Sequence, residues 1–234
     1  MGKKAVTGTL LDVYHRLLDR YGPQHWWPAD SPFEVMIGAI LTQSAAWANV
    51  EKAINNLKAR DALSIDALRR LPVEELARLV YPSGYYNAKA GKIKALVQWL
   101  AERYDGNLDK LFALDIPLLR RELLSIRGVG EETADSIILY AAHKPVFVID
   151  AYTRRILRRL GLAPATNSYA AFQDLFMQHL PHDEALFNEY HALLVRHGKE
   201  ACKKLLRCQY CCLASFCSVL RHGEKSIPER LQAR

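Results

Sequence analysis

Apolar residues recur at helical spacing along most of the chain. In residues 10–21, for example, Leu11, Tyr14 and Leu18 fall on one side of a helix. Alternation with a period of two is missing apart from the apolar run at residues 146–149, which is too short to found a sheet. The pattern therefore predicts an all-α fold, with helices over residues 10–21, 32–44, 46–59, 66–70, 72–80, 88–104, 117–124, 151–160, 169–180 and 183–197.

A tight glycine turn, Gly128-Val129-Gly130, joins two helices of this pattern, the second of which carries Ala134 and Ile138 on one face. A glycine at each end of the turn permits positive φ and lets another backbone come close. The second helix begins at the turn, so its free N–H groups and positive dipole end point outward. We therefore expect the turn to bind a phosphate through backbone donors without reading any base.

An aspartate stands between the apolar run 146–149 and a basic helix that begins near Ala151. Taken alone, Asp150 would most often be an N-cap, and a glycine turn between helices would often be only a turn. The order of helix, glycine hairpin, helix, apolar run and aspartate, however, resembles the helix-hairpin-helix DNA glycosylase superfamily, which contains endonuclease III.

This resemblance implies roles for both features. The hairpin, here Arg127, Gly128, Val129 and Gly130, would grip the DNA backbone, and Asp150 would lie at the scissile glycosidic bond. An ionised Asp150, steadied by the N-terminus of its helix, would stabilise the oxocarbenium-like sugar and orient the attacking water.

The resemblance also implies two helical lobes around a central cleft. One lobe is a continuous bundle, residues 29–142, which ends in the helix-hairpin-helix motif. The other joins residues 1–28 to residues 143–234 and includes a cysteine loop at 202–217. Composition alone marks no boundary between them.

Composition agrees with a globular DNA-binding protein. Of the 234 residues, 50% are hydrophobic and 24% charged, and the net charge of +7 has the sign that a phosphate partner requires. No apolar run approaches the length of a membrane span, and the first residues lead into no signal-peptide core. We expect a cytoplasmic monomer that makes no membrane contact and binds double-stranded DNA containing a damaged base.

All five cysteines lie close together, which argues against a spread disulfide framework and for one local metal site. The spacing Cys202-x5-Cys208-x2-Cys211-x5-Cys217 suits either zinc or an iron–sulfur cluster. A single close pair with two longer arms resembles the [4Fe-4S] loop that ends many endonuclease III relatives, although the first arm is one residue shorter here. Cys212 is then the spare cysteine.

A glycosylase must extrude its nucleotide and fill the gap that is left. By resemblance, Gln43 aligns with the inserted glutamine of the family and Tyr85 with its second intercalating residue. The alternative for Gln43 is a plain polar helix end. Bifunctional relatives carry a Schiff-base lysine two residues after the glycine turn, where this chain has Glu132. Without an amine there, no imine forms, so we expect a monofunctional enzyme with weak or absent lyase activity unless another lysine substitutes.

The base is suggested by two departures from related enzymes. The acid with which the adenine glycosylase branch protonates its base is replaced by Ala39, so a purine that already carries positive charge fits better. Aromatic rings attract such a cation. The candidates Trp26, Trp27 and Trp47, together with the turn motifs above, resemble 3-methyladenine DNA glycosylase III, which has phenylalanine at the position of Trp47.

We therefore predict a glycosylase for N-alkylated purines such as 3-methyladenine. Of Trp26 and Trp27, we expect one to serve packing alone. The first alternative is an endonuclease III-like glycosylase for oxidised, deaminated or mispaired pyrimidines. The second is a non-catalytic module that binds damaged DNA, against which Asp150 argues.

Overall fold

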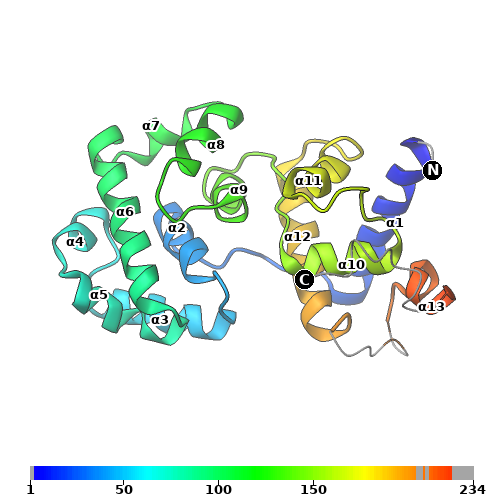
Figure 1. Cartoon of the computed structure of the whole chain (residues 1–234), viewed down its shortest axis with the longest axis horizontal. Helices are drawn as coiled ribbons and strands as arrows, with labels where there is room; N and C mark the ends of the chain where they lie inside the picture. The colour runs from blue at the N-terminus through cyan, green and yellow to red at the C-terminus, as the bar shows by residue number, and fades with distance from the viewer. Residues whose placement is uncertain (1–2, 204–207, 209–210, 223–234) are drawn as a thin grey trace. The chain divides into compact units, whose positions relative to one another are not determined.

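The computed structural model describes residues 3–203, 208 and 211–222, and its regular structure is helical throughout that part of the chain (Figure 1). The all-α prediction is confirmed. The chain forms two compact units, one of Met1–Trp26 with Pro145–Arg234 and the other of Trp27–Lys144. The sequence placed these junctions at residues 28 and 142; whether each unit folds as an independent domain stays a prediction.

The continuous unit, Trp27–Lys144, is a bundle around one apolar helix. Its elements are α2 (Pro32–Leu41), α3 (Trp47–Ala59), α4 (Ile65–Arg70), α5 (Val73–Leu79), η1 (Tyr81–Ser83), α6 (Tyr86–Tyr104), α7 (Leu108–Phe112), α8 (Ile116–Leu124) and α9 (Glu131–Tyr140). Helix α2 begins sharply because Ser31 accepts a hydrogen bond from the Glu34 N–H and Pro32 occupies the first turn. Its residues from Phe33 to Leu41 are buried, since the helix packs against α3, α6 and α9.

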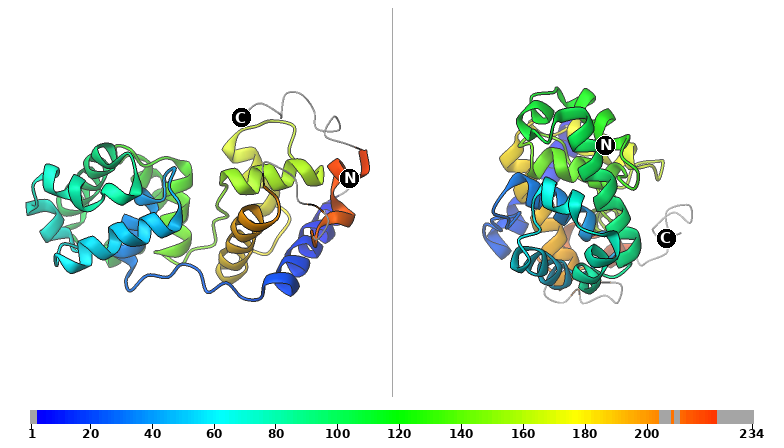
Figure 2. Two further views of the ribbon diagram at one scale, coloured as in Figure 1. Left: turned by 90° about the horizontal axis from the view of Figure 1, so that it is seen from below. Right: turned by 90° about the vertical axis from the view of Figure 1, so that its left-hand side faces the viewer.

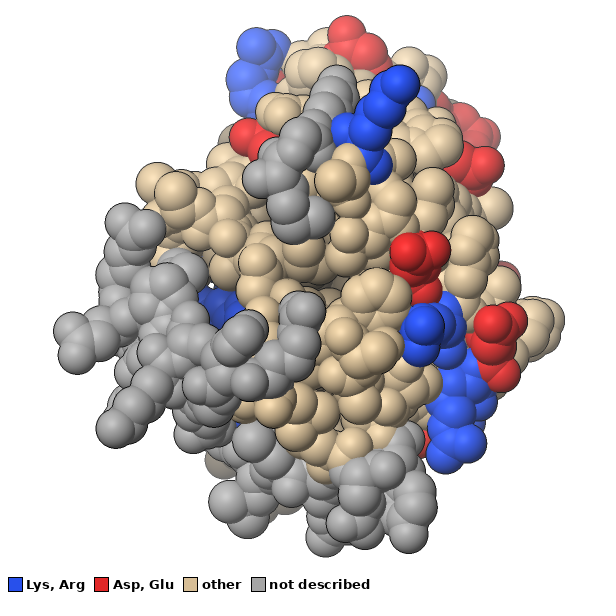
Figure 3. Space-filling model, turned by 90° about the vertical axis from the view of Figure 1, so that its right-hand side faces the viewer, with Lys and Arg blue, Asp and Glu red and all other residues tan. Residues whose placement is uncertain are grey.

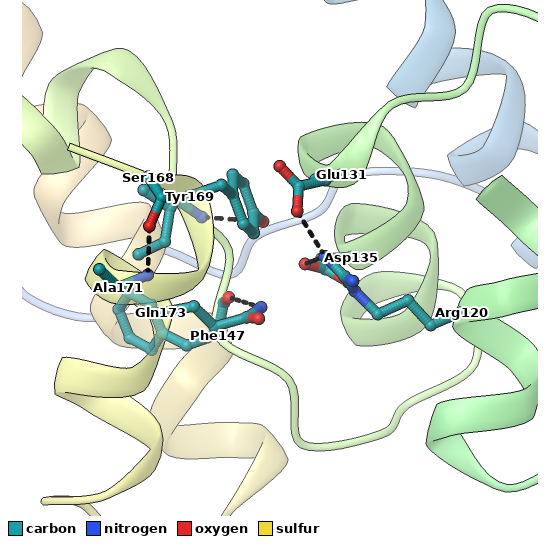
Figure 4. A network of polar contacts seen from close by, with 9 residues as sticks. Arg120, Glu131, Asp135, Phe147, Ser168, Tyr169, Ala171 and Gln173 are labelled. Atoms are coloured by element: carbon teal, nitrogen blue, oxygen red, sulfur yellow. Dashed lines mark hydrogen bonds and ion pairs between the residues drawn. The ribbon is translucent and has the colours of Figure 1, made fainter. Parts of the chain in front are cut away.

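Helices α8 and α9 are held together by a buried ion pair (Figure 4). The Arg120 guanidinium donates to both carboxylate oxygens of Asp135, at 2.7 and 3.2 Å, and reaches Glu131 at 3.4 Å. The Asp135 side chain is fully buried, so its charge depends on this partner. The ion pair therefore fixes the spacing between α8 and α9, and the hairpin that connects them has to bridge this distance.

The discontinuous unit is built on α1 (Lys3–Tyr21), α10 (Ala151–Leu160), α11 (Tyr169–Met177), α12 (Glu184–Glu200), η3 (Ala214–Phe216) and α13 (Ser218–His222). Helix α12 packs against α1 and α10 (Figure 2). The core of this unit is aromatic: Phe147 stacks on Phe176 at 3.6 Å between ring centroids. The fully buried Tyr190 donates its hydroxyl hydrogen to the Leu10 carbonyl at 2.8 Å and so joins α12 to α1. None of the helices in the described part has the length and apolar character of a membrane span.

Helix ends differ from the predictions at several points. The predicted helix at 32–44 stops at Leu41, because a turn with Ser44 at φ 55° follows. The predicted helix at 10–21 begins at Lys3, and the short helices α7 and α13 were not predicted. Five residues carry too little periodicity to be recognised as a helix. The apolar run 146–149 forms no strand.

Candidate functional site

The glycine turn needs its glycine at one end only. Gly128 has φ of +91°, and a Cβ there would meet the side chain of Lys92. Gly130 has φ of −98°, and nothing lies within 4 Å of a Cβ built on it. Both glycines permit positive φ, but only Gly128 adopts it, and the backbone of Gly130 lies in a region that other residues also adopt. Val129 is 6% exposed and anchors the turn in the core, while Arg127 and both glycines are exposed.

The N-terminus of α9 follows directly from the turn. Gly130 is its N-cap residue, and no side chain caps it. The backbone N–H groups of the first turn therefore suit an anion. Glu131 and Glu132 also lie in this turn and are exposed. Glu132, which the resemblance places at the position of a lyase lysine, is thus a surface carboxylate.

Gln43 is bound to the hairpin, which the sequence did not indicate. Its Nε2 donates to the Gly128 carbonyl at 3.2 Å and to the Thr133 hydroxyl at 2.9 Å. Its Oε1 accepts a hydrogen bond from Lys92 Nζ at 2.5 Å. The structure therefore joins Gln43 directly to the hairpin and adds Lys92, a residue that sequence reasoning missed. Gln43 and Tyr85, the two residues expected to fill the gap in the DNA, are called the wedge candidates below.

Tyr85, the second wedge candidate, protrudes from a strained turn. Its side chain is 75% exposed, and it is the N-cap residue of α6 with φ of 45°. A left-handed backbone is uncommon for a bulky residue and persists where the surrounding structure imposes it. The preceding Gly84 also has positive φ, 68°, so the turn projects the ring of Tyr85 into solvent.

Two of the three candidate tryptophans meet. The rings of Trp27 and Trp47 lie edge to face, 5.3 Å apart at 87°, and Trp27 lies 5.4 Å from Tyr140. The indole of Trp27 rests on Gly38 of α2, where a Cβ would come within 3.0 Å of it. Trp26 belongs to the other compact unit.

Trp27 and Trp47 line an open cavity of about 380 Å³ in the continuous unit. Asp30, Glu34 and Glu51 supply carboxylates to its wall, and Lys58 pairs with Asp30 at 2.7 Å and Glu34 at 2.9 Å. These pairs raise the pKa of Lys58, so this lysine stays protonated at neutral pH. The cavity combines aromatic faces with an excess of negative charge, a combination that favours a cation.

In the other unit, Asp150 is the N-cap residue of α10, as its position in the sequence indicates. Its Oδ1 accepts a hydrogen bond from the Thr153 N–H at 2.7 Å, and it is 9% exposed. The Nε2 of His191, on α12, lies 4.0 Å from its Oδ2. Burial lowers the pKa of His191 more than the Asp150 carboxylate raises it, so the imidazole is neutral at pH 7. His191 lies on a buried face of α12 and gave no signal in the sequence.

The cysteines expected to bind metal line one small cavity, of about 20 Å³, beside Arg159 and His197; they are Cys202, Cys208, Cys211 and Cys217. Cys212 does not line it. Residues 204–207 and 209–210 of the predicted loop lie outside the described residues. Within the described part, no three side chains of metal-ligating type come close enough to hold an ion.

The chemistry of this cavity nevertheless fits a thiolate-bound group. Arg159 donates from Nη1 to Cys202 Sγ at 3.2 Å, which places a positive charge beside the sulfur atoms. Burial raises the pKa of Cys211 to about 11, so without a metal this thiol is protonated, and ligation has to displace the proton. On the face of the molecule drawn in Figure 3, the basic side chains of the described residues stand in separate places, and those at the lower right lie beside acidic ones.

Comparison with known proteins identifies the family. A model described as HhH-GPD superfamily base excision DNA repair protein matches residues 37–182. The chain belongs to this superfamily. It is 45% identical, over 88% of its length and 94% of the relative's, to MJ1434 of Methanocaldococcus jannaschii, which carries the provisional name of DNA repair glycosylase.

Two solved structures of HhH-GPD type agree with this assignment. The 3-methyladenine DNA glycosylase MagIII of H. pylori, bound to 1,N6-ethenoadenine, has a TM-score of 0.71 and 26% identity, over 86% of this chain and 98% of that one. Endonuclease III in a trapped covalent intermediate with DNA has a TM-score of 0.78 and 23% identity, over 95% and 99%. The second likeness shows the fold, and both confirm the resemblance drawn from the sequence.

We predict that Gly128→Ala weakens binding to damaged and undamaged duplexes alike, by roughly tenfold, which corresponds to about 1.4 kcal/mol. The added methyl group meets Lys92 and strains the turn, so the hairpin backbone leaves the phosphate. Gly130→Ala is the matched control and should bind nearly as the wild type. Fluorescence anisotropy over a range of salt concentrations checks both, and the salt slope of the Gly128 variant should fall by roughly 1. Equal losses in the two variants, or a loss of lesion preference alone, would contradict the prediction.

Proposed function

We propose that this HhH-GPD protein is a monofunctional DNA glycosylase that releases an N-alkylated purine, such as 3-methyladenine, from double-stranded DNA. The observation that carries the choice of base is the aromatic and acidic cavity at Trp27 and Trp47. A purine alkylated at a ring nitrogen is a cation, and aromatic faces and carboxylates attract it. The likeness to a 3-methyladenine glycosylase supports the same choice.

Asp150 is the catalytic group in this proposal. The bond between the sugar C1′ and the base nitrogen breaks, and its electron pair leaves with the base. The Asp150 carboxylate stabilises the positive charge that develops on the sugar and orients the water whose oxygen then bonds to C1′, and the proton that this water loses passes to solvent. The Thr153 N–H holds one carboxylate oxygen, and His191 Nε2 lies 4.0 Å from the other.

A charged base also explains why no acid is needed at Ala39. An alkylated purine leaves as a neutral molecule, whereas an unmodified purine needs a proton to leave quickly. Ala39 is 3% exposed on α2 and supplies no such proton.

The absence of an amine at Glu132 supports hydrolysis over strand cleavage. Covalent catalysis at the sugar would need a lysine that forms an imine with C1′. The exposed carboxylate at this position cannot do so. The product would be an intact strand with an abasic site.

DNA would be held by the hairpin and by the two wedge residues. The backbone donors at Arg127, Gly128 and Gly130 suit a phosphate, and Gln43 and Tyr85 would fill the gap left by the extruded nucleotide. The hydrogen bonds from Gln43 to Gly128 and Thr133 support a coupling of grip and insertion.

Cys202, Cys208, Cys211 and Cys217 would hold a [4Fe-4S] cluster with a structural role. Four thiols lining one apolar cavity, with Arg159 donating to one of them, support this assignment. The cluster would tie α10 to the C-terminal end of α12.

A glycosylase for oxidised, deaminated or mispaired pyrimidines is the second candidate, because the endonuclease III fold extends over 95% of this chain. Duplexes that each carry one defined lesion separate the two candidates, since the released base is identified by its mass. Release of a pyrimidine lesion alone would overturn the choice of alkylpurine.

We predict that Asp150→Asn abolishes base release but keeps binding to the lesion. The shape is retained and the charge is lost, and single electrostatic groups of this kind contribute roughly 10²–10³ in rate. Single-turnover base release is the measurement. The wild-type product should break only after alkali, and borohydride should trap no covalent adduct. An efficient adduct would refute the monofunctional assignment, and full activity of the variant would refute the role of Asp150.

Trp47→Ala should lower the release of a cationic alkylpurine more than that of a neutral base, by roughly tenfold relative to it. Stacking and cation attraction are both lost for the first base, and only stacking for the second. Trp99→Ala, which alters a tryptophan outside the cavity, is the control. Parallel loss for charged and neutral bases would remove Trp47 as the cation platform.

Protein prepared without oxygen should be brown and contain about four irons per chain. Cys202→Ser and Cys217→Ser should lose iron, whereas Cys212→Ser should keep it, because Cys212 does not line the cavity. Metal analysis and visible absorbance check this. Stoichiometric zinc without iron would overturn the cluster assignment.

A further inference from the structure

A lysine is buried between the two wedge candidates. Lys89, on α6, is 1% exposed and is among the largest fully buried side chains of the described residues. Its Nζ donates to the Leu41 carbonyl at 2.9 Å and to the Ser83 carbonyl at 2.6 Å. Both partners are backbone oxygens, so neither compensates the ammonium charge as a carboxylate would.

Each of the two carbonyls belongs to the last residue of a helix and lies two residues before a wedge candidate. Leu41 is the last residue of α2, and Gln43 follows two residues later. Ser83 is the last residue of η1, and Tyr85 follows two residues later. The ammonium group is therefore hydrogen-bonded to the residue that precedes each of two turns, and each turn contains a residue proposed to enter DNA.

This arrangement is costly for the fold. Burial, and next the charge of Lys92, lower the pKa of Lys89 to about 8. A buried cation with only carbonyl partners stabilises a protein less than an apolar side chain of similar volume. The benefit of the lysine must therefore lie in what it holds rather than in packing.

The turns that it joins would otherwise move independently. Ser44 has φ of 55°, Gly84 of 68° and Tyr85 of 45°. Positive φ at non-glycine residues has to be imposed by neighbouring contacts. Two hydrogen bonds from one nitrogen fix the distance between the carbonyls, because each lies within 3 Å of the same atom.

We propose that Lys89 is a positioning residue that sets the spacing of Gln43 and Tyr85, so that both enter the DNA stack in one step. The inference rests on the proposed wedge roles of these two residues. Lys89 itself touches no DNA, since it is buried. Its loss should impair insertion at a lesion and leave the grip of the hairpin on undamaged DNA unchanged.

The chain offers a matched control on the same helix. Lys94 Nζ also donates to two backbone carbonyls, those of Leu68 at 2.6 Å and Arg69 at 2.8 Å. These carbonyls belong to the end of α4, which precedes neither wedge candidate. Lys94→Met therefore removes the same kind of contact without touching the proposed function of Lys89.

The test uses the full-length protein and two duplexes of one sequence. One duplex carries a tetrahydrofuran abasic analogue opposite 2-aminopurine, whose fluorescence rises on unstacking, and the other is undamaged. Lys89→Met should bind the undamaged duplex as wild type but lose roughly tenfold or more of its preference for the abasic duplex, together with the fluorescence rise. Lys89→Arg, which keeps the donors, should recover part of both, and Lys94→Met should change neither.

A combined variant decides whether Lys89 acts through the wedge. In a Gln43→Ala, Tyr85→Ala background, Lys89→Met should cause no further loss of preference, because residues that act as a unit are not additive. A full additional loss would overturn the proposal, as would an unchanged fluorescence rise in Lys89→Met alone. If Lys89→Met fails to fold by thermal melting, Lys89→Leu, which also lacks a donor, takes its place, and full preference in that variant would also overturn it.

The same data separate this inference from the proposed function. If the Gln43→Ala, Tyr85→Ala protein keeps wild-type preference and fluorescence, the wedge roles are wrong and the Lys89 proposal falls with them. If that protein loses both and Lys89→Met loses neither, the wedge roles stand and only the Lys89 proposal is overturned.

Discussion

The buried carboxylate of Asp135 constrains the motif on which the proposed DNA contacts depend. A fully buried charge must be paired, and Arg120 supplies two hydrogen bonds from the neighbouring helix. Helices α8 and α9 therefore keep one spacing, and the short turn between them has one course. That course requires positive φ at Gly128 and room for Lys92 against it. Because Lys92 and the hairpin both bind Gln43, the ion pair also helps to fix the place of a wedge candidate on the end of α2.

Much of this fold could be predicted from local patterns. The predicted helix starts at residues 32, 151 and 183 lie within one residue of the observed starts, where Ser31, Asp150 and Asp183 cap the first turn. Helix ends were harder to predict: the helix expected to reach Ser44 stops at Leu41. The sequence also could not distinguish Gly128 from Gly130. A glycine permits positive φ without requiring it, so only the packing of Lys92 shows which of the two glycines is obligatory.

The residues of the candidate site also fall into two groups: those that a local motif reveals and those that only tertiary contacts reveal. Asp150, Glu132 and the cysteine spacing could be recognised because each belongs to a local motif, and their proposed roles stay predictions. His191 and Lys89 could not, because their contacts join residues far apart in the chain. Trp26 and Trp27 are adjacent in sequence, yet they fall into different compact units. No periodicity in the sequence marks this division, nor the contact of Trp27 with Trp47.

The acidic first turn of α9 narrows how such a hairpin can bind DNA. Glu131 and Glu132 stabilise the positive end of the helix dipole, but they also repel the phosphate that this end would bind. Arg120 offsets Glu131 at 3.4 Å, and Glu132 is exposed. In the proposed function, attraction would then come from the backbone donors of the turn and from the exposed Arg127, which read no sequence. If Glu132 stands where relatives carry their lyase lysine, as the resemblance implies, the exchange removes both a nucleophile and a positive charge from the site. A cationic base would be repelled by a lysine at this position. Such a base also leaves the sugar without an amine nucleophile, so a glutamate here is consistent with hydrolysis of an alkylated purine.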